Sequence, residues 1–152
     1  MSTVAAALRP IPIPRSNELR DDPAAQAFLL MRIAFTVAPI LFGLDKFANV
    51  LTDDWTKYLS SDFNSLLPGT AATGMHIVGI VEIAAGIIVA ITPRFGGYLV
   101  ALWLAGIILN LLLIGGYGDI ALRDFGLLLA ALSLTRLATA YSGGDRSPVD
   151  LR

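Results

Sequence analysis

Four long apolar segments dominate this sequence and restrict what the chain can fold into. They cover about residues 24–44, 71–91, 95–114 and 120–140. Each is close to the ~20 residues that an α-helix needs to cross about 30 Å of hydrocarbon. Because lipid offers no hydrogen-bond partner to an exposed peptide group, such segments cross a membrane as helices. The sequence therefore predicts an all-α, multi-pass integral membrane protein whose four transmembrane helices form a bundle.

The composition supports a membrane protein and excludes several other classes. Only 15% of the 152 residues are charged, whereas soluble domains carry about 25%. The 11 basic and 12 acidic residues nearly balance, so no basic patch suits nucleic acid. The chain has no cysteine and one histidine, which excludes disulfides, Cys-ligated clusters and the usual zinc sites through its own side chains. We expect the lipid bilayer as the main partner, and no metal.

The arginines near the ends of the apolar segments predict the orientation of the bundle. They are Arg9, Arg15, Arg20, Arg94, Arg136, Arg146 and Arg152. Lys and Arg accumulate on the cytoplasmic side of a membrane, and in a four-span topology these positions share one side. We therefore predict that both termini are cytoplasmic, in what we expect to be a prokaryotic plasma membrane. Residues 45–70 then form a long extracytoplasmic loop.

The two ends of the chain are predicted to lie outside the bundle. Residues 1–23 contain an alternating Pro-Ile run, which favours extended polyproline geometry without internal hydrogen bonds, so we expect a mobile cytoplasmic tail. Asp22 and Pro23 then fit the cap and the first position of a helix. Residues 141–152 are expected to form a second cytoplasmic tail.

The first loop combines aromatic and acidic side chains. It contains Phe47, Trp55, Tyr58 and Phe63, and Trp and Tyr favour the membrane interface. Our main interpretation is an interfacial segment that lies on the bilayer. A lid over a bundle cavity, or a docking surface for a partner protein, is the alternative.

Two charges fall deep within the apolar segments, and we predict that they form an ion pair. At 1.5 Å per residue, Arg32 lies about 12 Å from one membrane face and Glu82 about 16 Å from the other. In a core of about 30 Å these depths nearly coincide, and charges in hydrocarbon usually pair inside a bundle. Gly79 and Gly86 share the face of Glu82 and allow close approach of another helix. The alternative is that Arg32 reaches the headgroups and Glu82 is protonated.

Six more polar residues lie toward the extracytoplasmic ends of the segments. They are Asp45, Lys46, His76, Asn110, Arg123 and Asp124. We call them the outer polar layer. It either lines a small ligand pocket or closes the bundle at one end.

Each member of the outer polar layer has an expected contact. Because a cation is unfavourable at a helix N-terminus, Arg123 needs an acidic partner, for which Asp45 and Asp119 are candidates. Asp124 is a candidate partner for Lys46. Two residues are predicted to be structural. They are His76, as a lone hydrogen-bonded histidine, and Asn110, through an interhelical hydrogen bond.

The apolar segments also carry three short motifs. They are Phe42-Gly-Leu-Asp-Lys-Phe47, then Glu82-Ile-Ala-Ala-Gly86 followed by Thr92-Pro-Arg94, and Ala121-Leu-Arg-Asp-Phe-Gly-Leu-Leu-Leu129. Their order, spacing and placement resemble the DoxX-like family of small four-helix membrane proteins, over roughly residues 28–140. The long aromatic first loop departs from the family pattern.

The resemblance implies a membrane subunit that works beside a redox partner. The family takes its name from a membrane subunit associated with an archaeal thiosulfate:quinone oxidoreductase. No cofactor motif transfers to this chain, so a quinone is the electron carrier that the resemblance suggests. The candidate contacts to quinone carbonyl groups are Glu82, His76, Arg123 and Trp103.

Three functions stay open at this point. The first is a redox-accessory or structural subunit with a protein partner. The second is a quinone-reactive oxidoreductase component, and the third is a small-molecule or ion carrier. No residue is indicated as catalytic, and a homo-oligomer is compatible with the sequence.

Overall fold

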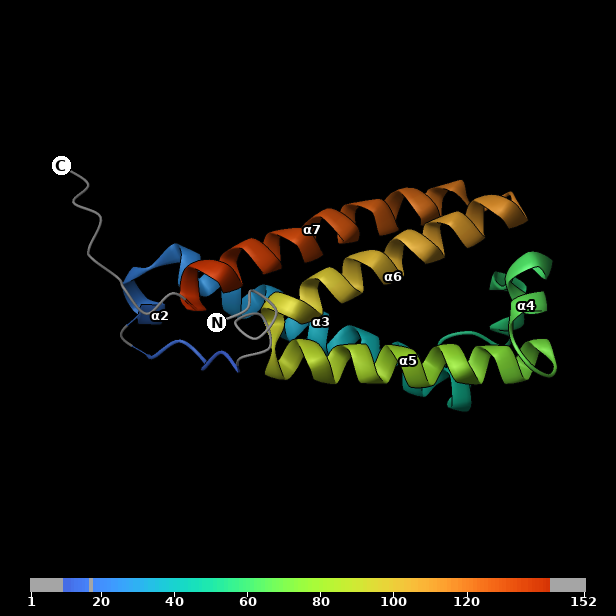
Figure 1. Ribbon diagram of the computed structural model, residues 1–152, viewed down its shortest axis with the longest axis horizontal. Helices are drawn as coiled ribbons and strands as arrows, with labels where there is room; N and C mark the ends of the chain where they lie inside the picture. Colours follow the sequence, from blue (N-terminus) through green and yellow to red (C-terminus); the bar gives the residue numbers. More distant parts are fainter. Residues whose placement is uncertain (1–9, 17, 143–152) are drawn as a thin grey trace, which may run out of the picture.

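The chain is helical in the computed structural model, which describes residues 10–16 and 18–142. In chain order the elements are α2 (Glu18–Asp21), α3 (Pro23–Ala48), η1 (Thr56–Tyr58), α4 (Ser61–Leu66), α5 (Ala71–Ile91), α6 (Pro93–Ile114) and α7 (Gly118–Ser142). Figure 1 shows α3, α5, α6 and α7 as long rods, with α4 at one end. The predicted all-α fold with four long helices is confirmed.

Three of these helices, α3, α5 and α6, are long and apolar enough to cross a membrane. Large apolar side chains are exposed along the long helices, among them Leu30, Ile80, Leu102 and Leu122. An apolar surface of this extent marks a membrane-facing or partner-facing protein. The chain is therefore a multi-pass membrane protein by its candidate spans. The fourth helix, α7, is of similar length but carries more charge, and its crossing of the membrane stays a prediction.

The helix boundaries follow from capping residues in the sequence. Asp22 accepts a hydrogen bond from Ala24 N at 2.9 Å, and Pro23 occupies the first turn. The side chains of Ser60 and Thr70 cap α4 and α5 in the same way. Each cap satisfies a backbone N–H that the first helical turn leaves without an internal partner.

The long helices pack as two antiparallel pairs, α3 with α5 and α6 with α7. Glycines make both contacts close. A Cβ added to Gly43 would lie 2.5 Å from the Gly79 carbonyl oxygen, and one added to Gly97 would lie 2.9 Å from that of Ala131. The expectation that Gly79 allows a close helix approach is therefore confirmed. The contact also fixes the register of α3 against α5, which decides which side chains meet.

The bundle has two distinct ends. The turn end holds Thr92, between α5 and α6, and the start of α3. The loop end holds η1, α4 and the turn between α6 and α7 (Figure 1). At the turn end, Tyr141 Oη donates to Asp22 at 2.8 Å, so the start of α3 and the last turn of α7 lie together.

Part of the N-terminal segment lies against the turn end. Ile11 and Pro14 are buried, and their spacing matches the three residues per turn of polyproline geometry. Ile11 N donates to Ile91 O at 3.4 Å. Ile11 and Pro14 therefore contact the turn end, and the mobility predicted for residues 1–23 stays a prediction. Residues 1–9, 17 and 143–152, which include most of the predicted C-terminal tail, lie outside the described residues.

Candidate functional site

A buried lysine and a buried glutamate form an ion pair inside the bundle. Lys46 Nζ from α3 lies 2.6 Å from Glu82 Oε2 of α5, and the two side chains are 4% and 10% exposed. Charges removed from water are tolerated when they pair and hydrogen-bond. The contact of Gly43 with Gly79 brings the two helices close enough for this pair to form.

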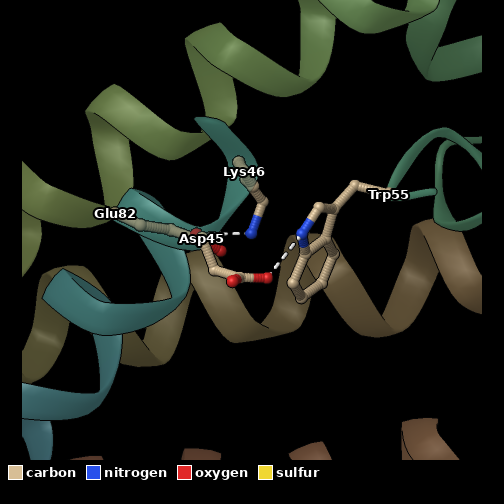
Figure 2. A network of polar contacts seen from close by, with 4 residues as sticks. All are labelled: Asp45, Lys46, Trp55 and Glu82. Carbon is tan, nitrogen blue, oxygen red and sulfur yellow. Dashed lines mark hydrogen bonds and ion pairs between the residues drawn. The ribbon is translucent and has the colours of Figure 1, made fainter. Parts of the chain in front are cut away.

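Two further residues complete the arrangement around the ammonium group. The Trp55 ring lies over Lys46 Nζ, 4.2 Å from the ring centroid to the nitrogen, in a cation–π contact. Trp55 Nε1 donates to Asp45 Oδ2 at 2.9 Å (Figure 2). We call Asp45, Lys46, Trp55 and Glu82 the charge cluster.

Asp45 also accepts backbone hydrogen bonds at the end of α3. Its carboxylate accepts hydrogen bonds from Val50 N at 2.9 Å and Leu51 N at 3.0 Å. Just before them, Asn49 adopts the left-handed conformation, with φ of 53°, which Asn tolerates better than most residues. Asp45 therefore closes the backbone after α3 and orients the Trp55 ring over Lys46.

Trp103 of α6 brings a third long helix to the cluster. Its indole Nε1 is buried and lies near Glu82 without reaching hydrogen-bond geometry. The sequence nominates both residues as quinone contacts, and the structure places them close together.

The structure does not bring Arg32 to Glu82. Arg32 Nε donates to Ala90 O at 3.2 Å, and Arg32 Nη1 donates to Pro12 O at 3.3 Å, both at the turn end. Ala90 lies eight residues from Glu82 along α5, which is about 12 Å. Helical side chains lean toward the N-terminus of their helix. Arg32 therefore leans toward the turn end, away from Glu82.

The same rule explains the pair that does form. On α3, Lys46 leans toward the turn end, and on the antiparallel α5, Glu82 leans toward the loop end. The two side chains thus point at each other. A signal for this was present in the sequence, because Gly43 precedes Lys46 by the same three residues by which Gly79 precedes Glu82.

Asn110 fastens the first loop to α6. Its Oδ1 accepts from Ser60 N at 2.9 Å, and its Nδ2 donates to Tyr58 O at 2.6 Å. The sequence predicts an interhelical hydrogen bond for Asn110, but the side chain satisfies the backbone between η1 and α4 instead. Two buried loop groups are paired in this way.

The remaining members of the outer polar layer, Arg123, Asp124 and His76, do not contact the charge cluster through a hydrogen bond or an ion pair in the described residues. Arg123 is exposed, and its Nε lies 3.9 Å from Asp124 Oδ1. The structure pairs it with neither Asp45 nor Asp119, and it pairs Lys46 with Glu82 rather than with Asp124. The exposed ring of His76 stacks on Phe47, with centroids 4.7 Å apart. The predicted layer is therefore not one connected network in the described residues.

A hollow opens beside the charge cluster at the loop end. Its volume is about 140 Å³, and its lining includes Lys46, Asn49, Asp53, Asp54, Trp55 and His76. A cavity of about 150 Å³ accepts one benzene-sized ring. The hollow therefore matches a single small ring in size.

The acidic rim of this hollow is ordered by its own hydrogen bonds. Asp54 accepts from the Thr56 hydroxyl at 2.6 Å and from Thr56 N at 2.8 Å. These bonds favour the ionised form and hold the pKa of the Asp54 carboxyl below its usual value. Within residues 10–16 and 18–142, no three acidic or histidine side chains gather in a way that could hold a metal ion.

Comparisons with protein-family models, with curated proteins and with solved structures find no match to this chain. What stands is a small all-helical protein with three long apolar helices and a buried ion pair between two of them.

Proposed function

We propose that this chain is a DoxX-like membrane protein with four membrane-spanning helices. As a candidate fourth span, α7 packs along α6 through the close contact at Gly97. Its side chains Leu122, Phe125 and Leu129 are exposed on the surface of the molecule. Four spans place both termini on one side. The arginine distribution favours the cytoplasm for that side, and we propose a prokaryotic plasma membrane as the location.

Within this proposal, the protein acts as an accessory subunit that supports a partner protein in a membrane complex. The observation that carries the idea is the order of the part of the first loop that follows α3, residues 49–70. Buried contacts from Asp45 and Asn110 hold it against the bundle. At its end Leu66 is 78% exposed. An ordered loop that exposes an apolar side chain outside the long helices is better suited to docking a partner protein than a loop that only connects two helices.

Site-specific crosslinking tests this function in the native membrane. A photoreactive residue at Leu66 is expected to give one protein adduct at near-stoichiometric yield. The same residue at Leu102, which is 73% exposed on a candidate span, is the matched control and is expected to label lipid. Asn110→Leu frees the loop and is expected to reduce the Leu66 adduct at equal expression. If Leu66 gives no adduct and the chain purifies alone in mild detergent, the accessory role is wrong.

A quinone-reactive component is the second candidate, and the hollow is the observation that favours it. One headgroup ring fits its volume, and Lys46 and His76 supply N–H donors of the kind that contact carbonyl oxygens. Purified protein is then expected to retain quinone, and His76→Phe, which removes an N–H donor from the lining and keeps an aromatic ring, is expected to reduce the bound amount at least tenfold. The candidate fails if no quinone is retained and Glu82→Gln leaves a quinone-linked assay unchanged.

A further inference from the structure

The segment after α3 begins closer to the middle of the bundle than the loop-end termini of α5 and α6. With Gly43 against Gly79, α3 ends at Ala48 while α5 continues toward the loop end for about one more turn. On the other side, Asn110 binds the backbone of Tyr58 and Ser60. Asn110 itself lies about one turn before the end of α6. We call residues 49–60 the plug.

The plug exposes large apolar side chains at this depth. Val50 is 81% exposed and Leu51 is 63% exposed. Phe47, in the last turn of α3, is about half exposed. They continue the exposed apolar surface of α3, to which Phe42 and Leu44 belong. The α3 surface belongs to a candidate membrane span, and Val50 and Leu51 follow the last residue of that span by two and three residues.

Part of the backbone of the plug is hydrogen-bonded to a side chain of the bundle. Because lipid-exposed irregular backbone does not occur within the hydrocarbon region, such a segment can lie no deeper than the boundary between headgroups and acyl chains. The N–H groups of Val50 and Leu51, the two most exposed apolar residues of the plug, donate to the Asp45 carboxylate. These bonds leave fewer unpaired polar groups beside the exposed Val50 and Leu51 side chains.

We propose that the start of the plug lies at the boundary between lipid headgroups and acyl chains at the loop end. There Val50 and Leu51 contact acyl chains, while the exposed charged residues Asp53, Asp54 and Lys57 face water. The occupant of this surface is lipid and not a protein partner. The plug then seals the loop end of the α3–α5 pair from water. The Lys46–Glu82 pair, which Trp55 of the plug covers, lies in the low-dielectric region behind it. This inference does not depend on the proposed accessory or quinone role.

The absence of cysteine makes the test direct. Val50→Cys and Lys57→Cys are each spin-labelled in purified protein within phosphatidylcholine vesicles. Val50 makes little packing contact, so its replacement is expected to leave the fold intact. The label at position 50 is expected to collide more often with oxygen than with a water-soluble nickel chelate, and the label at the exposed Lys57 is expected to show the reverse.

Two results would overturn the proposal. If position 50 meets the nickel chelate as often as position 57 does, the start of the plug lies in water as well. If position 50 is shielded from both quenchers, protein covers it, and the surface is a contact between copies of this chain. An independent reading comes from a membrane-impermeant maleimide, which is expected to react at least tenfold more slowly with Val50→Cys than with Lys57→Cys in vesicles. Equal rates in vesicles would also refute it.

Discussion

Replacing Glu82 by glutamine leaves the Lys46 ammonium buried without its counter-charge. The amide oxygen of Gln still accepts a hydrogen bond, and the Trp55 ring still lies 4.2 Å from Nζ, but neither supplies a negative charge. Removing one partner of a buried pair costs about 3–5 kcal/mol. Because the hydrogen bond and the cation–π contact of about 0.5–2 kcal/mol survive, we expect a loss near 3 kcal/mol.

Thermal unfolding in a single detergent measures this loss, with the remaining folded protein at each temperature quantified by size-exclusion chromatography. At about 2–4 °C per kcal/mol for a chain of this size, Glu82→Gln is expected to lower Tm by roughly 6–12 °C. The matched control is the double variant Lys46→Met with Glu82→Leu, which replaces the pair by apolar side chains of similar volume. Such replacements are often neutral or stabilising, so its Tm is expected to stay within about 4 °C of the parent.

The double variant also decides whether the reasoning is right. If the pair is buried in low dielectric, the cost of each single change comes from the charge left behind, and removing both charges relieves it. The single and double variants are then strongly non-additive. If Glu82→Gln changes Tm by less than about 2 °C, or if the double variant loses the sum of the two single losses, the pair is solvated and the argument fails.

Three further predictions concern the helix contact, the loop and its acidic rim. Gly79→Val forces α3 and α5 apart and is expected to cost more than about 2 kcal/mol, whereas Gly106→Ala, with open space around it, is expected to be neutral or slightly stabilising in the same Tm assay. Asn110→Leu leaves two loop backbone groups unpaired and is expected to cost about 2–4 kcal/mol. It should also raise proteolysis between η1 and α4, and an unchanged cleavage rate would contradict this. The lowered pKa of Asp54 means that its hydrogen bonds to Thr56 stabilise the loop above the usual pKa of 3.8 and are lost as the pH falls below it. Loop proteolysis by an acid-active protease should therefore increase below about pH 4 in the parent but not in Asp54→Asn.

The sequence predicts the helices well because their determinants are local. Apolar segments of membrane-spanning length, the cap at Asp22 and the glycine pair after Ile114 set the boundaries within a few residues of those observed. The end of α3 is the exception, since the helix continues four residues beyond the predicted 44. There Asp45 and Lys46 are polar but buried. Because polar residues lower the local hydropathy, the sequence pattern predicts a loop where the helix in fact continues.

The site is harder to predict because it depends on register. Placing Arg32 and Glu82 by depth from the segment ends assumed that the paired helices end at the same level. In the structure α5 extends beyond α3 at the loop end, which moves Glu82 toward the last turn of α3, and Arg32 leans the other way. The kind of contact, a buried pair of opposite charges, follows from physical chemistry. The identity of the cation required knowing where Gly43 meets Gly79.

The neighbouring residues Asp45 and Lys46 couple the first loop to the helix pair. Successive residues on a helix point about 100° apart, so Asp45 turns toward the loop backbone while Lys46 turns toward α5. Trp55 closes the connection, because its N–H binds one of these residues and its ring covers the other. A ligand or partner that displaces the indole would uncover the Lys46 ammonium and remove one of the hydrogen bonds of the Asp45 carboxylate. A change in the position of Trp55 is therefore expected to affect both the loop backbone after α3 and the Lys46–Glu82 pair.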